Sequence, residues 1–362
     1  MPIRIGTTSY KSPISKAYVG TALYYQNAPV SRTISYYGTA PNMNTVRCDN
    51  YLAGVSFNGY AVFGGGVVNT SFAGTKLVDA YDSNLTLHKL TDFTTARGSN
   101  PSGVTPSHCI FAGGRNGIKS AEAYNTDLTK VSSVPDLVYS RYDSATVSVG
   151  NYLVIAGGES NSNVRNTAEC YDDDLTKVDV PSLYAKMWQF GDSGTSLGNY
   201  GIIACGGYYA PSGSALLCNL TFAYDTNLTK TDLANLTVSV AGIMSASTDT
   251  YSFFAGGGKS NGKSNIVNVY DQNLTKQPDL ELSASRHAGT GVGVRDYVLI
   301  AGGHTASNVV DIYDNDLTHT IGHTLSSARY SLASATTGNY LLIAGGQNGN
   351  TIYKTVDVYE VS

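Results

Sequence analysis

The stretch from Tyr152 to Asp172, YLVIAGGESNSNVRNTAECYD, joins a short apolar run ending in Gly-Gly to a polar loop and a second run ending in Tyr-Asp. The pattern recurs seven times, with successive copies 43 to 53 residues apart. The doublets are Gly64/Gly65, Gly113/Gly114, Gly157/Gly158, Gly206/Gly207, Gly256/Gly257, Gly302/Gly303 and Gly345/Gly346, and the tyrosines are Tyr81, Tyr124, Tyr171, Tyr224, Tyr270, Tyr313 and Tyr359. Short β-rich runs and Gly-rich turns at so long a period are typical of a radial array whose units bury their apolar faces against one another. We therefore predict an all-β fold, a seven-bladed β-propeller.

Each unit is predicted to contain four short strands. The first is small and polar, as in Ser144 to Ser148, which suits the crowded centre of a ring. The second is apolar and ends at Gly-Gly, where residues without a side chain can take positive φ and let another backbone approach. The third ends in Tyr-Asp or a variant of it, and a compact turn of the form YDxNLT or YDxDLT leads to the fourth.

The last unit ends three residues after Tyr359, so it has no fourth strand of its own. The segment from Thr33 to Gly38 is an unassigned strand before the first unit. We predict that it pairs with the third strand of the last unit, which closes the ring and removes two exposed sheet edges. Residues 30–362 are then the propeller.

Residues 1–29 are predicted to be an N-terminal β-hairpin extension, because Ile5 to Tyr10 returns in similar form as Val19 to Tyr24. An isolated hairpin is marginal in water, so it needs a partner surface. That surface is either the ring or a partner protein, and a homo-oligomer through residues 1–29 is one such arrangement.

Composition excludes several classes of protein. Charged residues are 14% of the chain, against about 25% in typical globular proteins, the net charge is −4, and no Lys/Arg run occurs. A nucleic-acid or anionic-membrane binder would carry a basic patch, so neither partner is expected. The five cysteines imply no disulfide framework.

Any route to the cell exterior would be by lysis or assembly, because no targeting segment is evident. The first residues, MPIRIGTTSY, contain no apolar signal-peptide core, and no stretch approaches the length of a membrane span. We therefore expect no signal peptide and no membrane insertion.

The Ala-Gly-Gly run, the Val-x-Val-Tyr-Asp run and the acidic residue two places before the tyrosine resemble the kelch-repeat family of β-propellers over about residues 30 to 362. That family usually has tryptophan at the start of the fourth strand. This chain has leucine instead, at Leu85, Leu128, Leu175, Leu228, Leu274 and Leu317, so its outer strands should pack differently. The segment from Ile14 to Tyr25 is similar to small repeats in kelch-type tail-associated proteins of phages and prophages of gut Gram-positive bacteria. The resemblance implies a virion structural or host-attachment protein. It also implies that the protein is located in a virion, or outside the cell after lysis, and otherwise in the bacterial cytoplasm.

Two positions vary together among the seven units. Five units have arginine before the first strand and an acidic residue in the third strand. The fourth unit has Met187 or Phe190 with Phe222, and the fifth has Val240 with Asn268, so both partners are lost together. Because a buried charge must be paired, we predict structural ion pairs within single blades. They are Arg47 with Asp79, Arg97 with Glu122, Arg141 with Glu169, Arg286 with Asp311, and Arg329 with Asp357.

The loop between Gly-Gly and Tyr-Asp varies in length, whereas Tyr-Asp lies 32 to 35 residues before the next Gly-Gly. Variable loops on a rigid scaffold usually carry recognition, so their face is the predicted binding surface. The fourth unit has the longest such loop and the single tryptophan. Its candidate ligand-binding residues are Tyr184, Trp188, Tyr208 and Tyr209, which suit sugar rings or protein contacts but equally suit packing between blades. The second candidate region for ligand binding is the first unit's long loop, Val67 to Thr75.

No chemistry-bearing motif is evident. The histidines, at His88, His108, His287, His304, His319 and His323, show no metal-ligand spacing with the cysteines, and no GxSxG, P-loop or dinucleotide fingerprint occurs. No metal, cofactor or catalytic residue is expected. We predict a non-catalytic binding or structural propeller that contacts other virion proteins or host-surface glycans or proteins. The alternatives are a carbohydrate-active enzyme using the central funnel and an intracellular bacterial interaction scaffold.

Overall fold

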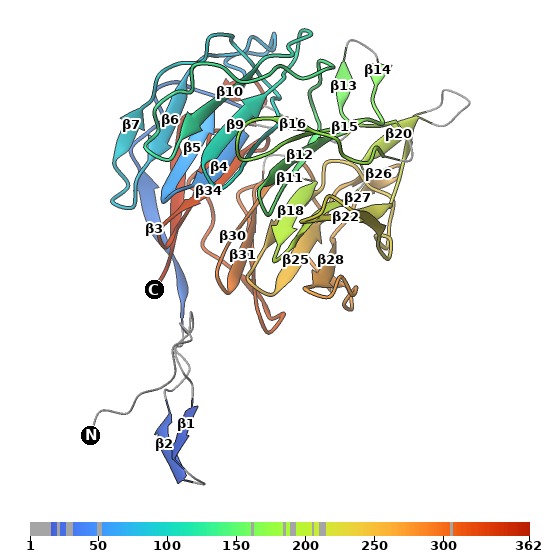
Figure 1. Ribbon diagram of the computed structural model, residues 1–362. Coiled ribbons are helices and arrows are strands. Elements are labelled where there is room, and N and C mark those ends of the chain that lie inside the picture. The colour runs from blue at the N-terminus through green and yellow to red at the C-terminus, as the bar shows by residue number, and fades with distance from the viewer. Residues whose placement is uncertain are drawn as a thin grey trace.

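A computed structural model describes residues 16–19, 22–26, 32–48, 53–160, 163–183, 186–188, 193–204, 206–209, 215–304 and 307–362. All regular structure within these residues is β, and Figure 1 shows the sheets arranged radially around one ring. Seven antiparallel sheets form the blades, so the predicted seven-bladed propeller is confirmed. No helix in the described part of the chain is long and apolar enough to cross a membrane.

The four strand positions of a blade run outward from the ring axis. The innermost strands are β4 (Ala53–Phe57), β8 (Ser102–Val104), β11 (Ala145–Val149), β18 (Gly194–Leu197), β24 (Met244–Ser247), β30 (Thr290–Val294) and β34 (Ala333–Thr337). The second strands are β5 (Tyr60–Gly64), β9 (His108–Ala112), β12 (Tyr152–Ala156), β19 (Tyr200–Ala204), β25 (Tyr251–Ala255), β31 (Tyr297–Ala301) and β35 (Tyr340–Ala344). Every second strand is buried after its first residue, because both of its faces pack on neighbouring blades.

The third strands are β6 (Val78–Tyr81), β10 (Ala121–Asn125), β15 (Ala168–Tyr171), β22 (Thr221–Asp225), β28 (Ile266–Asp271), β32 (Val310–Asp314) and β38 (Val356–Val361). The outer strands are β7 (Leu87–Lys89), β16 (Lys177–Val178), β23 (Lys230–Asp232), β29 (Leu280–Glu281), β33 (His319–Ile321) and β3 (Ile34–Ala40). In the second blade a single bridge between Tyr124 and Lys130 takes the outer place. A separate hairpin, β1 (Lys16–Val19) with β2 (Ala22–Gln26), lies in the N-terminal region.

The hydrophobic core is divided into seven clusters, each between two adjacent blades. Between the third and fourth blades, Val147 and Val154 belong to the same cluster as Ile203 and Phe222. Full burial of one such side chain contributes about 1.5–3 kcal/mol. Since each cluster takes residues from two blades, a single blade has no complete core.

The Gly-Gly doublets hold adjacent blades together. Gly157 and Gly158 have φ of +67° and +90°, and a Cβ on Gly157 would lie 2.7 Å from the carbonyl oxygen of Met187 in the next blade. The Gly158 N–H donates to that same oxygen at 2.8 Å. The equivalent bond from Gly346 to the Arg47 carbonyl, at 2.9 Å, joins the last blade to the first.

The first doublet is not at the predicted place. Gly65 and Gly66 have the positive φ values of their sister doublets, and Gly66 N–H donates to the Arg97 carbonyl at 3.1 Å. Gly64 instead ends strand β5, where the other units have alanine. Three consecutive glycines left the register ambiguous in the sequence, so Gly64/Gly65 was wrong by one residue.

The Tyr-Asp pair anchors each third strand to the preceding blade and begins the next turn. Tyr171 is fully buried, and its hydroxyl donates to the Pro135 carbonyl at 2.6 Å. Asp172 Oδ1 accepts the N–H groups of Asp174 and Thr176 at 3.1 and 2.7 Å. Leu175 in this turn has φ +60°, a strained conformation for leucine, but its side chain is buried.

Strand β3 completes the last blade, as predicted. It pairs antiparallel with β38, from Ile34 opposite Val361 to Ala40 opposite Val356. Figure 1 shows β3 beside the red C-terminal strand. The predicted boundary between an extension at 1–29 and a propeller from 30 falls among residues that are outside the described ranges.

The cysteines depart from expectation at one position. Cys48, Cys109 and Cys170 are free and buried, whereas Cys218 is disulfide-bonded. The expectation that no disulfide would form was therefore wrong at Cys218, because an odd cysteine count says nothing about individual pairs.

Candidate functional site

Most of the longer loops lie on one face of the ring. Here the innermost strands begin and the second strands end, and four of the following loops form small ribbons. These are β13 (Glu159–Ser160) with β14 (Asn163–Val164), β20 (Gly207–Tyr209) with β21 (Ala215–Leu217), β26 (Gly258–Lys259) with β27 (Gly262–Lys263), and β36 (Gln347–Asn348) with β37 (Thr351–Ile352). We call this the ribbon face. The opposite face carries short turns such as that between Val149 and Tyr152.

The fourth blade adds a third strand to its ribbon. Strand β17 (Met187–Trp188) pairs with β20, placing Met187 opposite Tyr208 and Trp188 opposite Gly207. The backbone thus brings the segments of Trp188, Tyr208 and Tyr209 together on the ribbon face. The structure describes only the backbone of these three, and Tyr184 lies outside the described residues.

The predicted ion pairs form within their own blades. Arg97 contacts Glu122 at 2.7 Å, and Arg141 contacts Glu169 at 2.7 Å. Arg286 with Asp311 and Arg329 with Asp357 are both at 2.5 Å, and Arg47 pairs with Asp79. All five guanidinium groups are buried. Met187, also fully buried, takes the arginine's place in the fourth blade, since its carbonyl accepts the Gly158 N–H as that of Arg141 accepts Gly114 N–H.

These pairs also hold the backbone beside Gly-Gly. Arg141 Nη1 donates to the carbonyls of Gly157 and Thr167 at 2.8 and 2.9 Å. Burial by itself would raise the pKa of the Glu169 carboxyl, but the Lys177 hydrogen bond and the Arg141 charge together hold that pKa below its ordinary value. The pairs therefore fix the scaffold and lie away from any opening.

The first unit's long loop contributes an exposed aromatic ring. Phe72 is 49% exposed, and its ring contacts the Arg115 guanidinium at 4.8 Å. The other aromatic contact of Arg115 is Tyr142, also at 4.8 Å. Arg115 thus lies between loops of three blades. Burial and the nearby Glu159 charge raise the pKa of Tyr142 to about 12, so its phenol is neutral at pH 7.

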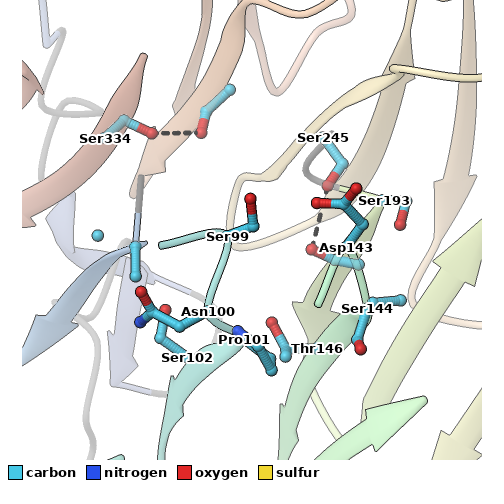
Figure 2. Close-up of a pocket in the computed structure, with 15 residues that line it drawn as sticks. Ser99, Asn100, Pro101, Ser102, Asp143, Ser144, Thr146, Ser193, Ser245 and Ser334 are labelled. Atoms are coloured by element: carbon cyan, nitrogen blue, oxygen red, sulfur yellow. Dashed lines mark hydrogen bonds between the residues drawn. The ribbon is translucent and has the colours of Figure 1, made fainter. Parts of the chain in front are cut away.

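Arg115 also contacts two residues of the central channel. Its Nε donates to Ser99 Oγ at 2.9 Å, and its guanidinium lies 3.7 Å from the Asp143 carboxylate. Ser99 and Asp143 line a cavity of about 200 Å³ where the channel opens on the ribbon face. We call it the mouth cavity. Figure 2 shows Ser99, Asn100, Asp143, Ser193 and Ser245 around the same opening.

Two buried polar side chains of the mouth cavity have no partner within the described part of the protein. Asn100 is 2% exposed, and neither its amide oxygen nor its amide nitrogen makes a hydrogen bond. Ser193 is also 2% exposed, and its hydroxyl is likewise without a partner. Buried polar groups are normally satisfied, so each exception calls for an explanation.

Below the mouth the channel continues as a space of about 390 Å³ lined by small and hydroxyl side chains. Here the hydroxyls have partners in adjacent blades. Ser196 Oγ donates to the Ser148 carbonyl at 2.6 Å, and Ser247 Oγ donates to the Ser196 carbonyl at 2.7 Å. They satisfy the free edges of the innermost strands, so this part of the channel has a structural role.

A histidine pair lies elsewhere on the ribbon face. The rings of His287 and His304 are 5.1 Å apart, and Tyr330 is 5.0 Å from His304. Burial, together with the neighbouring His304, lowers the pKa of His287 to about 4, so the ring is neutral at pH 7. Among the described residues, no group of three or more His, Cys, Asp or Glu side chains could hold a metal ion.

The mouth-cavity residues were not among the sequence candidates. Asn100 lies in a connection, Arg97 to Ser102, whose small polar residues look like any loop. The available signal was that the second unit alone has Asn-Pro directly before its first strand, at Asn100 and Pro101. Arg115 follows its Gly-Gly doublet directly, where the other units have different residues.

Comparison with known proteins agrees with this geometry. The Kelch motif model matches residues 140–175 and 328–362. The chain is a kelch-type β-propeller. No curated protein matches the kelch propeller's sequence.

Two solved structures share the fold. The structure of YjhT matches with a TM-score of 0.58 and 13% identity, covering 75% of this propeller and 99% of YjhT. A fungal alcohol oxidase of the AA5 family in complex with copper matches with a TM-score of 0.66 and 14% identity, covering 89% of this propeller and 76% of the oxidase. At such identities the likeness concerns the fold alone.

Proposed function

We propose that this kelch-type propeller is a non-catalytic binding protein, associated with the tail of a phage or prophage particle, that contacts host-surface glycans or proteins through its ribbon face. The observation that carries the proposal is the one-sided elaboration of the ring. Four ribbons, strand β17 and the loop of Phe72 lie on the ribbon face, whereas the opposite face bears short turns. Variable loops on a rigid scaffold are the usual place for recognition.

The chemistry of the ribbon face supports contact with a polar, uncharged surface. Phe72 offers an exposed ring, and the segments of Trp188 and Tyr208 are paired beside the fourth blade's ribbon. Aromatic side chains of this kind commonly dominate binding energy at interfaces. The tail-associated setting rests on the similarity of Ile14 to Tyr25 to repeats in phage proteins.

A cell-binding assay tests the proposal. Labelled propeller is incubated with gut Gram-positive cells and with purified cell walls, and the retained fraction is measured. We expect Phe72→Ser and Tyr208→Ala each to weaken retention by about fivefold or more. Ile321→Ser is the matched control, because Ile321 is 66% exposed but lies on the outer strand β33.

Three results would count against the proposal. Retention on no cell or wall preparation, together with absence of the chain from purified particles by mass spectrometry, would exclude an attachment role. Turnover of a sugar in a substrate panel would favour the enzyme alternative. Capture on bacterial cytosolic proteins with no cell binding would favour the intracellular scaffold.

A further inference from the structure

The mouth cavity has a wall of unusual uniformity. Its lining consists of serine, threonine, glycine, alanine, proline, one asparagine and one aspartate. None of the described residues that line it is lysine, arginine or histidine. Such a wall presents many hydrogen-bond donors and acceptors and little apolar surface.

The amide of Asn100 is held in a fixed position although it has no partner among the described residues. A Cβ on Gly65 would lie 2.6 Å from Asn100 Oδ1, so the amide oxygen packs directly on the backbone of the first blade. Asn100 has one acceptor and two donor hydrogens to offer, and Ser193 adds a hydroxyl from the fourth blade. Buried polar groups without a partner in the described part of the protein call for an explanation, and a polar ligand in the cavity that they line would satisfy them.

The charge of the cavity selects a neutral ligand. Its single carboxylate, Asp143, faces the Arg115 guanidinium 3.7 Å away, so much of its charge is already compensated. An anionic ligand would meet this carboxylate without a cation in the wall. A cationic ligand would compete with Arg115 for one carboxylate.

The size of the cavity fits one sugar ring. Its volume of about 200 Å³ is more than ten times the ~10–15 Å³ that one water molecule needs. A hexopyranose presents hydroxyls around its whole edge, each able to donate and accept, which matches a wall of hydroxyls with one amide.

We propose that the mouth cavity binds one neutral hexopyranose unit, non-covalently, with Asn100 and Ser193 hydrogen-bonding its hydroxyls. This deepens the proposed function and rests on it for the source of the sugar, because the bound unit would be the end of a surface glycan. Free monosaccharide and the glycan terminus share the same chemistry, and the two arms of the test separate them.

The first arm titrates D-glucose, D-galactose, D-mannose and N-acetyl-D-glucosamine into the full chain, with binding followed by saturation-transfer NMR and calorimetry. We expect at least one of these to bind with a millimolar Kd, and glucuronate to bind at least tenfold more weakly. Asn100→Ala should weaken binding at least tenfold and Ser193→Ala about threefold or more. Ser252→Ala is the matched control, because Ser252 is also buried, its hydroxyl also has no partner within the residues that the structure describes, and it lies outside the cavity.

Circular dichroism checks that each variant folds. If Asn100→Ala does not fold, the effect of Ser193→Ala on sugar binding decides the test. Absence of binding by all four sugars at 50 mM (on the order of tenfold above a millimolar Kd) would overturn the proposal. Binding that is equally strong in Asn100→Ala and Ser193→Ala would also overturn it.

The second arm repeats the cell-wall retention assay with the same variants. Loss of retention in Asn100→Ala supports a glycan terminus as the source, and loss of monosaccharide binding alone supports the free sugar. If wild-type chain binds the sugar but no cell wall, the host-attachment function fails while the cavity proposal stands. If cell walls retain both wild type and Asn100→Ala and no sugar binds, only the cavity proposal fails.

Discussion

Replacing Arg141 by methionine should be far more damaging than neutralising its partner. Arg141 makes four hydrogen bonds, to the Gly157 carbonyl at 2.8 Å, the Thr167 carbonyl and hydroxyl at 2.9 and 3.0 Å, and Glu169 at 2.7 Å. A typical hydrogen bond contributes about 1 kcal/mol net, and one between charged groups about 1.5–3. The expected loss is therefore about 4.5–6 kcal/mol, at or slightly above the ~3–5 kcal/mol cost of breaking a buried pair.

Glu169→Gln should cost only about 2–3 kcal/mol, because glutamine still accepts a hydrogen bond and Arg141 keeps its backbone partners. Glutamine has one acceptor oxygen, so Arg141 and the Tyr139 N–H, which both bond Oε1, can keep their acceptor, whereas the Val138 N–H, which bonds Oε2 at 2.7 Å, loses its own. In the double variant neither member of the Arg141–Glu169 pair is left charged without the other, so its loss should fall short of the sum by about 2 kcal/mol.

The assay is urea unfolding at pH 7 followed by circular dichroism, with the slope of the transition compared among variants. Lys177→Met serves as a control, since the Lys177 side chain is 25% exposed and its loss should cost about 1 kcal/mol or less. Losses that add to within about 0.5 kcal/mol would refute the coupling. Equal losses for the two single variants would refute the role of Arg141 in holding the backbone.

Three further predictions concern the ring. Removing residues 1–40 leaves the edge of β38 exposed, so we expect a melting temperature at least about 10 °C lower and oligomers by light scattering; an unchanged melt would contradict closure by β3. Leu175→Ala should lower the free energy of unfolding, measured in urea, by about 2–3 kcal/mol. Leu175→Gly should lower it by about 1 kcal/mol less than the sum of the lost burial and the usual glycine penalty, because glycine adopts φ +60° without strain. A glycine variant whose loss equals that full sum would argue against strain at Leu175. Burial alone would raise the pKa values of Glu122 and Glu169, but lysine hydrogen bonds and arginine charges lower both. The stabilisation by these two carboxylates is therefore complete above the unfolded pKa of about 4.3, and it declines as the pH falls through the lower folded value. A urea midpoint that stays constant from pH 6 to pH 3 would disprove this.

The blade architecture was predictable because its causes repeat. The hydroxyl of Tyr171 and those of its six sister tyrosines all donate to a backbone carbonyl, and a role repeated seven times leaves a visible pattern. The ion pairs could be inferred for the same reason, since Val240 and Asn268 depart together. In the structure Asn268 Oδ1 accepts the Thr237 N–H at 2.8 Å, so asparagine keeps one carboxylate contact without the arginine.

The candidate site was less predictable because its members do not repeat. Asn100 and Ser193 come from connections of different blades, and only ring closure brings them to one opening. Their importance lies in lacking partners, which no sequence pattern records. The first doublet was misplaced because Gly64, Gly65 and Gly66 are chemically identical, and only the approach of the Arg97 carbonyl distinguishes them.

The seam between β3 and β38 has a mechanical consequence. Thr33 and Ser362 exchange backbone hydrogen bonds at 3.0 Å, so both ends of the ring emerge side by side at the outer edge of one blade. If a particle held the chain by residues 1–29, tension would enter the ring through β3 and load the bonds of this seam one after another. Such peeling yields at low force, and its rate of opening, rather than the equilibrium stability of the ring, would set how long a tethered propeller holds its load.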